Sequence, residues 1–274
     1  MYQKTKPRPL KLTSVAMRQM REIGAALFPN IHSSMKIAIL VDGGFYRKRA
    51  KILWKKENKQ DPSGEERAKE LEAYCLQHIK NSEIKDNHNC PADLYRIFYY
   101  DCPPAKGSVY HPFLKKNENL EKTDVYKWTT AFFNEIKKQR KFALRLGKLT
   151  TPKAYELKPN AAKDLLNRTR AIDELKKVDF RLATEQKGVD MRIGLDIASL
   201  AYKHLVDQII LIAGDSDFVP AAKLARREGI DFILDPMGQG VTPDLSEHID
   251  DLRTLTGEFS FFFKNLKTEI SVTD

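Results

Sequence analysis

The sequence has few cysteines and no long apolar segment, and both absences limit what the protein can be. Only three cysteines occur in 274 residues, Cys75, Cys90 and Cys102. An odd, widely spaced set predicts reduced thiols in the cytoplasm rather than a disulfide framework. No apolar run approaches the ~20 residues of a membrane-spanning helix. The basic N-terminus has no apolar stretch behind it, so no secretory signal and no membrane partner are predicted.

Several common catalytic and metal-binding motifs are missing as well. The sequence contains no Gly-x-Ser-x-Gly elbow and no Cys/His pair at a spacing suited to nucleophilic catalysis. Four side chains could suggest zinc, but their spacing does not match a structural zinc site: His78, His88, Cys90 and Cys102. There is also no internal repeat. These absences argue against a side-chain nucleophile and against a zinc centre.

The charge balance is basic, with 47 Lys and Arg against 37 Asp and Glu, a formal net charge of +10. A charge of this size favours polyanions as partners, because neutralised phosphates release counterions. Residues 1–34 carry six basic residues and one acidic residue, and we interpret them as a basic N-terminal extension. Met35 opens a clean apolar strand and is a candidate for the natural start of the chain.

Apolar strands and amphipathic helices alternate along residues 35–255, which predicts an α/β fold with a central, mainly parallel sheet. Strands are predicted at 36–41, 94–100, 142–146, 155–158, 179–186, 208–213 and 230–234, and helices at 44–57, 65–80, 118–140, 161–177, 190–205, 218–228 and 243–254. We interpret 103–178 as a mainly helical insertion that covers one side of the sheet. The tail, 256–274, contains Phe259–Phe263 and is expected to pack against the domain.

Aspartates follow four of the predicted strands directly or after one glycine: Asp42, Asp101, Asp215 and Asp235. Ligands of open parallel sheets bind outside the carboxyl ends of the strands, so Asp42 and Asp215 are expected to meet in one crevice. Carboxylates placed about 4 Å apart repel by several kcal/mol, and such a cluster is stable only when protonated or when it holds a cation. Oxygen ligands select Mg²⁺ or Mn²⁺.

Four further assignments have simpler structural alternatives. Asp215 and Asp217 can face the same side if the extended geometry persists, although Asp215 could be a turn residue and Asp217 the N-cap of helix 218–228. Asp190 is expected to point at the site from a helix start, where it could also be an N-cap. Asp196 lies in mid-helix among apolar residues, which predicts an outer metal ligand or a salt-bridge partner.

Three motifs together resemble the NYN domain family, in its LabA-like branch. They are Val41-Asp42-Gly43-Gly44-Phe45, Lys187-Gly188-Val189-Asp190 with Asp196, and Gly214-Asp215-Ser216-Asp217-Phe218. The resemblance implies a three-layer Rossmannoid, PIN-like domain over about 35–255. It also implies Mg²⁺- or Mn²⁺-dependent hydrolysis of single-stranded RNA to 5′-phosphate and 3′-hydroxyl ends. By this resemblance Asp42, Asp190, Asp215 and Asp217 form the metal-binding catalytic cluster.

Basic and aromatic residues near the acidic strand ends are expected to contact RNA: Arg47, Lys48, Lys51, Lys55, Lys187, Tyr46 and Phe218. The first four form a stripe on helix 44–57, and the two rings could stack on bases. The alternatives are a solvated face for the stripe, core packing for the rings and an ion pair for Lys187.

Two other functions compete with the ribonuclease. One is an RNA-binding or regulatory protein that keeps the fold without turnover; the presence of all four aspartates argues against it. The other is a small-molecule phosphohydrolase, which needs an Asp-x-Asp nucleophile after the first strand, whereas Asp42 is followed by two glycines. The sequence leaves open whether the chain forms a homo-oligomer.

Overall fold

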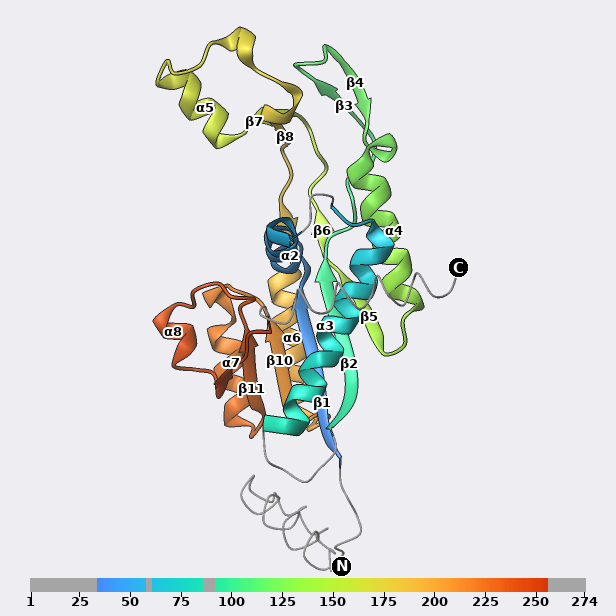
Figure 1. Cartoon of the computed structure of the whole chain (residues 1–274), viewed down its shortest axis with the longest axis vertical. Coiled ribbons are helices and arrows are strands. Elements are labelled where there is room, and N and C mark those ends of the chain that lie inside the picture. The colour runs from blue at the N-terminus through green and yellow to red at the C-terminus, as the bar shows by residue number, and fades with distance from the viewer. Residues whose placement is uncertain (1–33, 58–60, 86–91, 256–274) are drawn as a thin grey trace, which may run out of the picture.

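A six-stranded, all-parallel sheet runs through the part of the chain that the computed structural model describes, residues 34–57, 61–85 and 92–255 (Figure 1). Its spatial order is β12 (Asp251–Leu252), β11 (Asp231–Asp235), β10 (Gln208–Ile212), β1 (Met35–Asp42), β2 (Ala92–Asp101) and β5 (Phe142–Leu146). When the six strands are numbered 1 to 6 along the chain and the sheet is read from β5 to β12, the order is 3-2-1-4-5-6, that of a doubly wound fold. The predicted α/β class and parallel sheet are confirmed.

The central strand β1 is apolar because both of its faces are covered. Ile37, Ile39 and Val41 belong to one buried cluster. Ala38 and Leu40 belong to a second cluster on the opposite face. Side chains alternate across a strand, so a continuous apolar run is needed where helices cover both sides of a sheet.

Helices form the outer two layers. The first cluster is completed by α2 (Gly43–Glu57), α3 (Gly64–Lys85) and α4 (Asp124–Lys138). The second is completed by α6 (Val189–Tyr202), α7 (Val219–Arg227) and α8 (Pro243–Ser246). None of the helices in the described part of the chain is long and apolar enough to cross a membrane.

Residues 103–123 and 147–187 form a lobe beyond the carboxyl ends of the strands (Figure 1). The lobe contains two antiparallel hairpins, β3 (Ser108–His111) with β4 (Lys116–Asn119) and β7 (Tyr155–Leu157) with β8 (Phe180–Leu182), and the helix α5 (Pro159–Leu166). A third pair, β6 (Lys148–Leu149) with β9 (Gln186–Lys187), connects the lobe to the sheet. The chain enters the lobe from β2 and leaves it into α4, and it enters again from β5 and leaves into α6.

The structure corrects several predicted boundaries. The expected insertion 103–178 is not a single unit, because β5 is an edge strand of the main sheet and α4 packs against α3 in the core. Helix 161–177 ends at Leu166, and strand 179–186 shortens to β8 and β9. The predicted helix 243–254 is also wrong: α8 ends at Ser246, and the chain then adds β12 to the sheet edge.

Two predictions concern residues beyond the described part of the chain. The basic extension proposed for 1–34 falls outside it except for Ser34, and so does the tail 256–274 with its phenylalanines. Both remain predictions.

Candidate functional site

The two central strands of the sheet send the chain to opposite faces. The strand β1 continues into α2, which belongs to the first cluster, whereas β10 continues into α7, which belongs to the second. These two strands are neighbours in the sheet. In doubly wound folds a reversal of this kind marks the place at the carboxyl edge where ligands bind, and we refer to this place, between the ends of β1 and β10, as the crevice. Asp42 ends β1, and Asp215 lies just after β10.

The turn after β1 fixes the Asp42 carboxylate. Its Oδ1 atom accepts a hydrogen bond from the Phe45 N–H at 3.1 Å, in the first turn of α2. Gly43 is required there, because a Cβ atom would lie 2.5 Å from the Tyr100 carbonyl oxygen. The Asp42-Gly43-Gly44 sequence therefore lets the strand enter the helix against β2 while it holds the carboxylate at the crevice.

A close contact joins the turns after β1 and β10. A Cβ atom on Gly214 would lie 2.4 Å from the Phe45 ring, so the ring occupies the space that a side chain would take. Gly214 immediately precedes Asp215. This packing fixes the two aspartate-bearing turns relative to each other.

Asp215 and Asp217 occupy a short 3-10 turn, η4 (Ser216–Phe218). Asp215 caps that turn, because its Oδ1 accepts a hydrogen bond from the Asp217 N–H at 3.1 Å. Asp217 lies inside the turn with an exposed side chain, and the N-cap position of α7 is Phe218, so Asp217 does not cap that helix.

Asp190 lies in the first turn of α6 and is exposed. The N-cap position is Gly188, whose φ of 75° is left-handed and favours glycine. The pKa of the Asp190 carboxyl is raised by partial burial and by the charges of Asp215 and Asp217. Asp190 is therefore not a cap, and it lies within electrostatic reach of the β10 turn.

Asp42 interacts with the same group of charges. Its pKa is raised mainly by burial, with further increases from the carboxylates of Asp190 and Asp101; the backbone N–H groups of Phe45 and Gly44 oppose the shift. Asp190 thus interacts with Asp42 on one side and with the β10 turn on the other. Mutual repulsion among carboxylates is relieved when a cation lies between them.

The donor chemistry of this aspartate group suits a hard divalent ion, because every donor is a carboxylate oxygen. Among the residues that the structure describes, no three His, Cys, Asp or Glu side chains already lie close enough to hold one ion. The group fits Mg²⁺ or Mn²⁺ in chemistry.

Asp101, at the end of β2, is fully buried beside this group. Its Oδ1 accepts hydrogen bonds from Arg47 Nη2 at 2.9 Å and from the Cys102 N–H at 2.7 Å, and its Oδ2 accepts one from the Tyr99 hydroxyl at 3.2 Å. Burial raises the pKa of Asp101, and Arg47 opposes that shift. The strand-end pattern pointed to Asp101, but only the structure shows that it holds Arg47 next to Asp42.

Asp235, the fourth strand-end aspartate, is directed away from the crevice. It is buried, and it accepts hydrogen bonds from the Tyr74 hydroxyl, from His78 Nε2 at 2.9 Å and from the Met237 N–H at 2.7 Å. Tyr74 and His78 belong to α3. Asp235 therefore anchors a helix to the sheet.

Asp196 is already occupied by protein partners. It accepts a hydrogen bond from the Tyr100 hydroxyl at 2.8 Å and forms an ion pair with Arg145 at 3.2 Å. This arrangement matches the salt-bridge alternative for Asp196 and leaves it without a direct place in the aspartate group.

The residues expected to contact RNA separate into buried and exposed sets. Tyr46 and Phe218 are core residues, so the prediction that they stack on bases is wrong; the Tyr46 hydroxyl donates to Glu70 at 3.2 Å. Arg47 is committed to Asp101. Lys48 is exposed and available.

The other two exposed lysines of this set have acidic neighbours. Lys51 pairs with Asp61 at 3.3 Å, and Lys187 lies 3.9 Å from Glu185. Lys55 belongs to α2, but its side chain is outside the described part.

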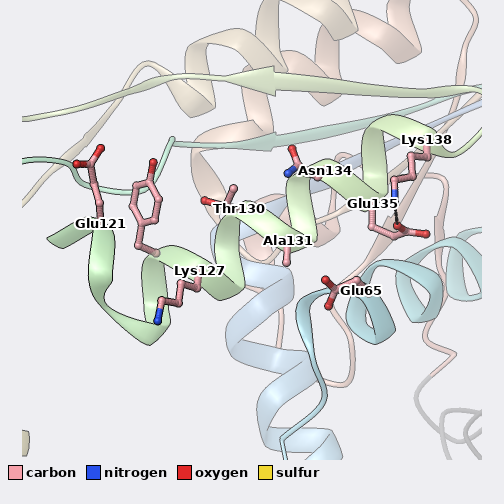
Figure 2. Close-up of a pocket in the computed structure, with 9 residues that line it drawn as sticks. Glu65, Glu121, Lys127, Thr130, Ala131, Asn134, Glu135 and Lys138 are labelled. Carbon is pink, nitrogen blue, oxygen red and sulfur yellow. Dashed lines mark hydrogen bonds and ion pairs between the residues drawn. The ribbon is translucent and has the colours of Figure 1, made fainter.

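A surface hollow lies elsewhere, between α3 and α4 (Figure 2). Its labelled lining includes Glu65, Lys127, Asn134 and Glu135, with Lys138 bonded to Glu135 at 2.8 Å. None of the aspartates of the crevice lines it. We therefore assign it no part in the site.

In a comparison with protein families, residues 118–247, slightly less than half of the chain, match the model of the NYN domain. The matched segment includes Asp190, Asp215 and Asp217 and begins after Asp42. A comparison with curated proteins gave no match.

Two solved structures align with most of the chain. They are titled "Sir2-p53 peptide-NAD+" and "Structural Basis for the Mechanism and Regulation of Sir2 Enzymes", with identities of 10% and 11% and TM-scores of 0.29 and 0.28. The first alignment covers 92% of this chain and 99% of the other, and the second covers 92% and 98%.

Proposed function

We propose that the protein is a cytoplasmic, metal-dependent ribonuclease of the LabA-like NYN branch, which hydrolyses single-stranded RNA at the crevice between β1 and β10. One observation carries this proposal. Asp42, Asp190 and the Asp215–Asp217 turn come from three separate elements, and their charges interact at the switch point of the sheet. The NYN match over 118–247 supports the same activity.

Asp42, Asp190, Asp215 and Asp217 would hold Mg²⁺ or Mn²⁺. Such an ion lowers the pKa of water and offsets the charge that develops on a phosphodiester. The protein's own contribution is positioning: the Phe45 N–H orients Asp42, and the contact between Phe45 and Gly214 sets the distance between the two turns. The reaction needs no side-chain nucleophile, and its products carry 5′-phosphate and 3′-hydroxyl ends.

Cations beside the crevice would neutralise the RNA backbone. Lys48 is exposed one turn into α2, and Lys187 is exposed three residues before Asp190. Arg47 forms an ion pair with Asp101, and the positive charge of Arg47 also acts on Asp42. Contacts of this kind position a phosphate without reading its sequence.

Labelled single-stranded RNA, incubated with the full chain and Mn²⁺ or Mg²⁺, tests the proposal. Cleavage should stop when a chelator is added and should fall about 100-fold or more in Asp42→Asn, Asp190→Asn and Asp215→Asn. The matched control is Asp244→Asn, an exposed aspartate on α8, which should keep full activity. Tight RNA binding without cleavage in either metal would instead identify a regulatory RNA-binding protein.

A further inference from the structure

The lobe carries a large share of the positive charge of the protein. Residues 103–123 and 147–187 contain fourteen Lys and Arg and eight Asp and Glu, a net charge of +6 out of the +10 of the whole chain. The lobe rises from the same edge of the sheet as the aspartate group (Figure 1). The basic surface therefore lies on the side of the molecule from which a substrate would approach.

Most of these cations are exposed and lack an acidic partner. Four of them form ion pairs, those of Arg170, Lys177, Arg181 and Lys187. The other ten are exposed and form no ion pair with another described residue. Unpaired, exposed cations are those that can neutralise phosphates.

The β3–β4 hairpin adds exposed aromatic rings to this charge. Tyr110 is 55% exposed and Phe113 is 43% exposed; Lys115 follows them in the turn, and Lys116 begins β4. Rings exposed beside lysines are suited to stacking on the bases of a single strand while the charges track its backbone. This hairpin thus has the exposed rings that the buried Tyr46 does not provide.

The hairpin is held in place by β7 and by the 3-10 turn η3 (Lys177–Asp179). The ring of His111 packs at 4.2 Å on the ring of Tyr155. Glu118 accepts hydrogen bonds from the Tyr155 hydroxyl at 2.5 Å and from Lys177 Nζ at 2.6 Å. A surface held in this way loses little freedom when it binds a ligand.

The hairpin and the aspartate group are also within reach of one strand of RNA. The hairpin packs on β7, which pairs with β8, and residues 180–186 lead from β8 to β9 just before Asp190. That segment spans at most about 25 Å when fully extended. An RNA chain of several nucleotides would therefore reach both places.

We propose that the β3–β4 hairpin, through Tyr110, Phe113, Lys115 and Lys116, is a docking surface for single-stranded RNA outside the aspartate site. This proposal rests on the ribonuclease function. It assigns recognition of longer RNA to the lobe rather than to the stripe on α2.

Fluorescence anisotropy with single-stranded RNA tests the hairpin directly, in the full chain carrying Asp42→Asn so that the RNA stays intact. RNAs of about 4 and about 16 nucleotides bracket the site sizes of single-strand-binding folds. The charge variant is Lys115→Asn with Lys116→Gln, because Lys115 has a φ of 52° and asparagine tolerates that region. The ring variant is Tyr110→Leu with Phe113→Leu, which keeps the apolar contact of Phe113 with Phe180.

The ring variant should weaken binding of the longer RNA about 10-fold or more. The charge variant should make the plot of log K against log salt concentration shallower, with the magnitude of its slope reduced by about 1.4. The shorter RNA should be cleaved at an unchanged rate when the hairpin variants are made in the active chain. The matched control is Lys80→Ala with Lys203→Ala, which should bind the longer RNA as the parent does; both lysines are exposed, Lys80 in the C-terminal half of α3 and Lys203 directly after α6.

The outcomes separate the two proposals. If the parent binds and cleaves RNA and the hairpin variants bind the longer RNA equally well, the docking surface is refuted and the ribonuclease stands. If the Lys80 and Lys203 control loses as much affinity for the longer RNA as the hairpin variants, the docking surface is also refuted, because the loss would then reflect the net charge of the protein and not the hairpin. If the unsubstituted chain neither binds nor cleaves RNA with Mn²⁺ or Mg²⁺, the ribonuclease itself is refuted.

Discussion

Substitution of Arg47 should destabilise the protein, because it leaves the buried Asp101 carboxylate without its cationic partner. Asp101 has no exposed surface, and Arg47 retains 27% exposure. In Arg47→Met, Asp101 keeps two donors, the Cys102 N–H and the Tyr99 hydroxyl. Loss of one partner of a buried pair costs about 3–5 kcal/mol, and the remaining donors place Arg47→Met at the lower end, about 3 kcal/mol.

The companion change, Asp101→Asn, should cost less. Arg47 is partly exposed and can turn to solvent, so only hydrogen bonds are lost, about 1–2 kcal/mol. The double variant Arg47→Met with Asp101→Asn removes the uncompensated charge. Its free energy of unfolding should therefore exceed the additive expectation by about 1–3 kcal/mol.

Urea unfolding followed by far-ultraviolet circular dichroism at pH 7 measures all three variants. Arg181→Met is the matched control, because its pair with Glu156 is about half exposed on both sides, and it should cost no more than about 1 kcal/mol. Additive effects of the two single substitutions, within about 0.5 kcal/mol, would refute a coupled pair beside the site.

Three further predictions follow from single positions. Gly214→Ala should destabilise the protein by about 1–3 kcal/mol and lower nuclease activity, because the new Cβ atom meets the Phe45 ring. The control is Gly194→Ala in α6, where the new Cβ atom has open space and should stabilise the protein by about 0.5–1 kcal/mol. Thermal unfolding compares the two variants. Burial raises the pKa of Glu70 to about 7, so its stabilising contribution is present below its ordinary pKa of 4.5 and is lost as the pH rises towards 7. The unfolding free energy of the protein relative to Glu70→Gln should fall over that window by at most about 1.4 kcal/mol per pH unit, and a difference independent of pH would contradict this. Asp196→Asn should lower stability but leave the metal concentration needed for half-maximal cleavage unchanged; a large increase would make Asp196 a ligand.

Most of the sheet could be predicted from sequence, because β1, β2, β10 and β11 are largely apolar runs with an aspartate at or just after their ends. The core strands β1 and β10 have buried residues on both faces, which no amphipathic helix produces. The strand β12 has only two residues, both exposed, so no pattern identified it. The strand β5 was found, but its place in the sheet depends on long-range pairing with β2.

Positions in the candidate site were predictable from strand ends, whereas side-chain directions were not. Tyr46, Ala50 and Trp54 recur every four residues and are all buried, so the helical period of α2 contained the signal that Tyr46 faces the core. Arg47 occupies the next face and meets Asp101. That pairing joins residues 54 positions apart and required the fold to be known.

Binding of Mn²⁺ to the full chain, followed by electron paramagnetic resonance, tests the proposed metal centre most directly. The Asp190 carboxylate interacts with the charges of both Asp42 and Asp215. Asp190→Asn should therefore weaken Mn²⁺ binding about 10-fold or more. The control Asp244→Asn should bind Mn²⁺ like the unsubstituted protein. Equal Mn²⁺ affinity in the unsubstituted protein and in Asp190→Asn would contradict a metal ion held by these aspartates.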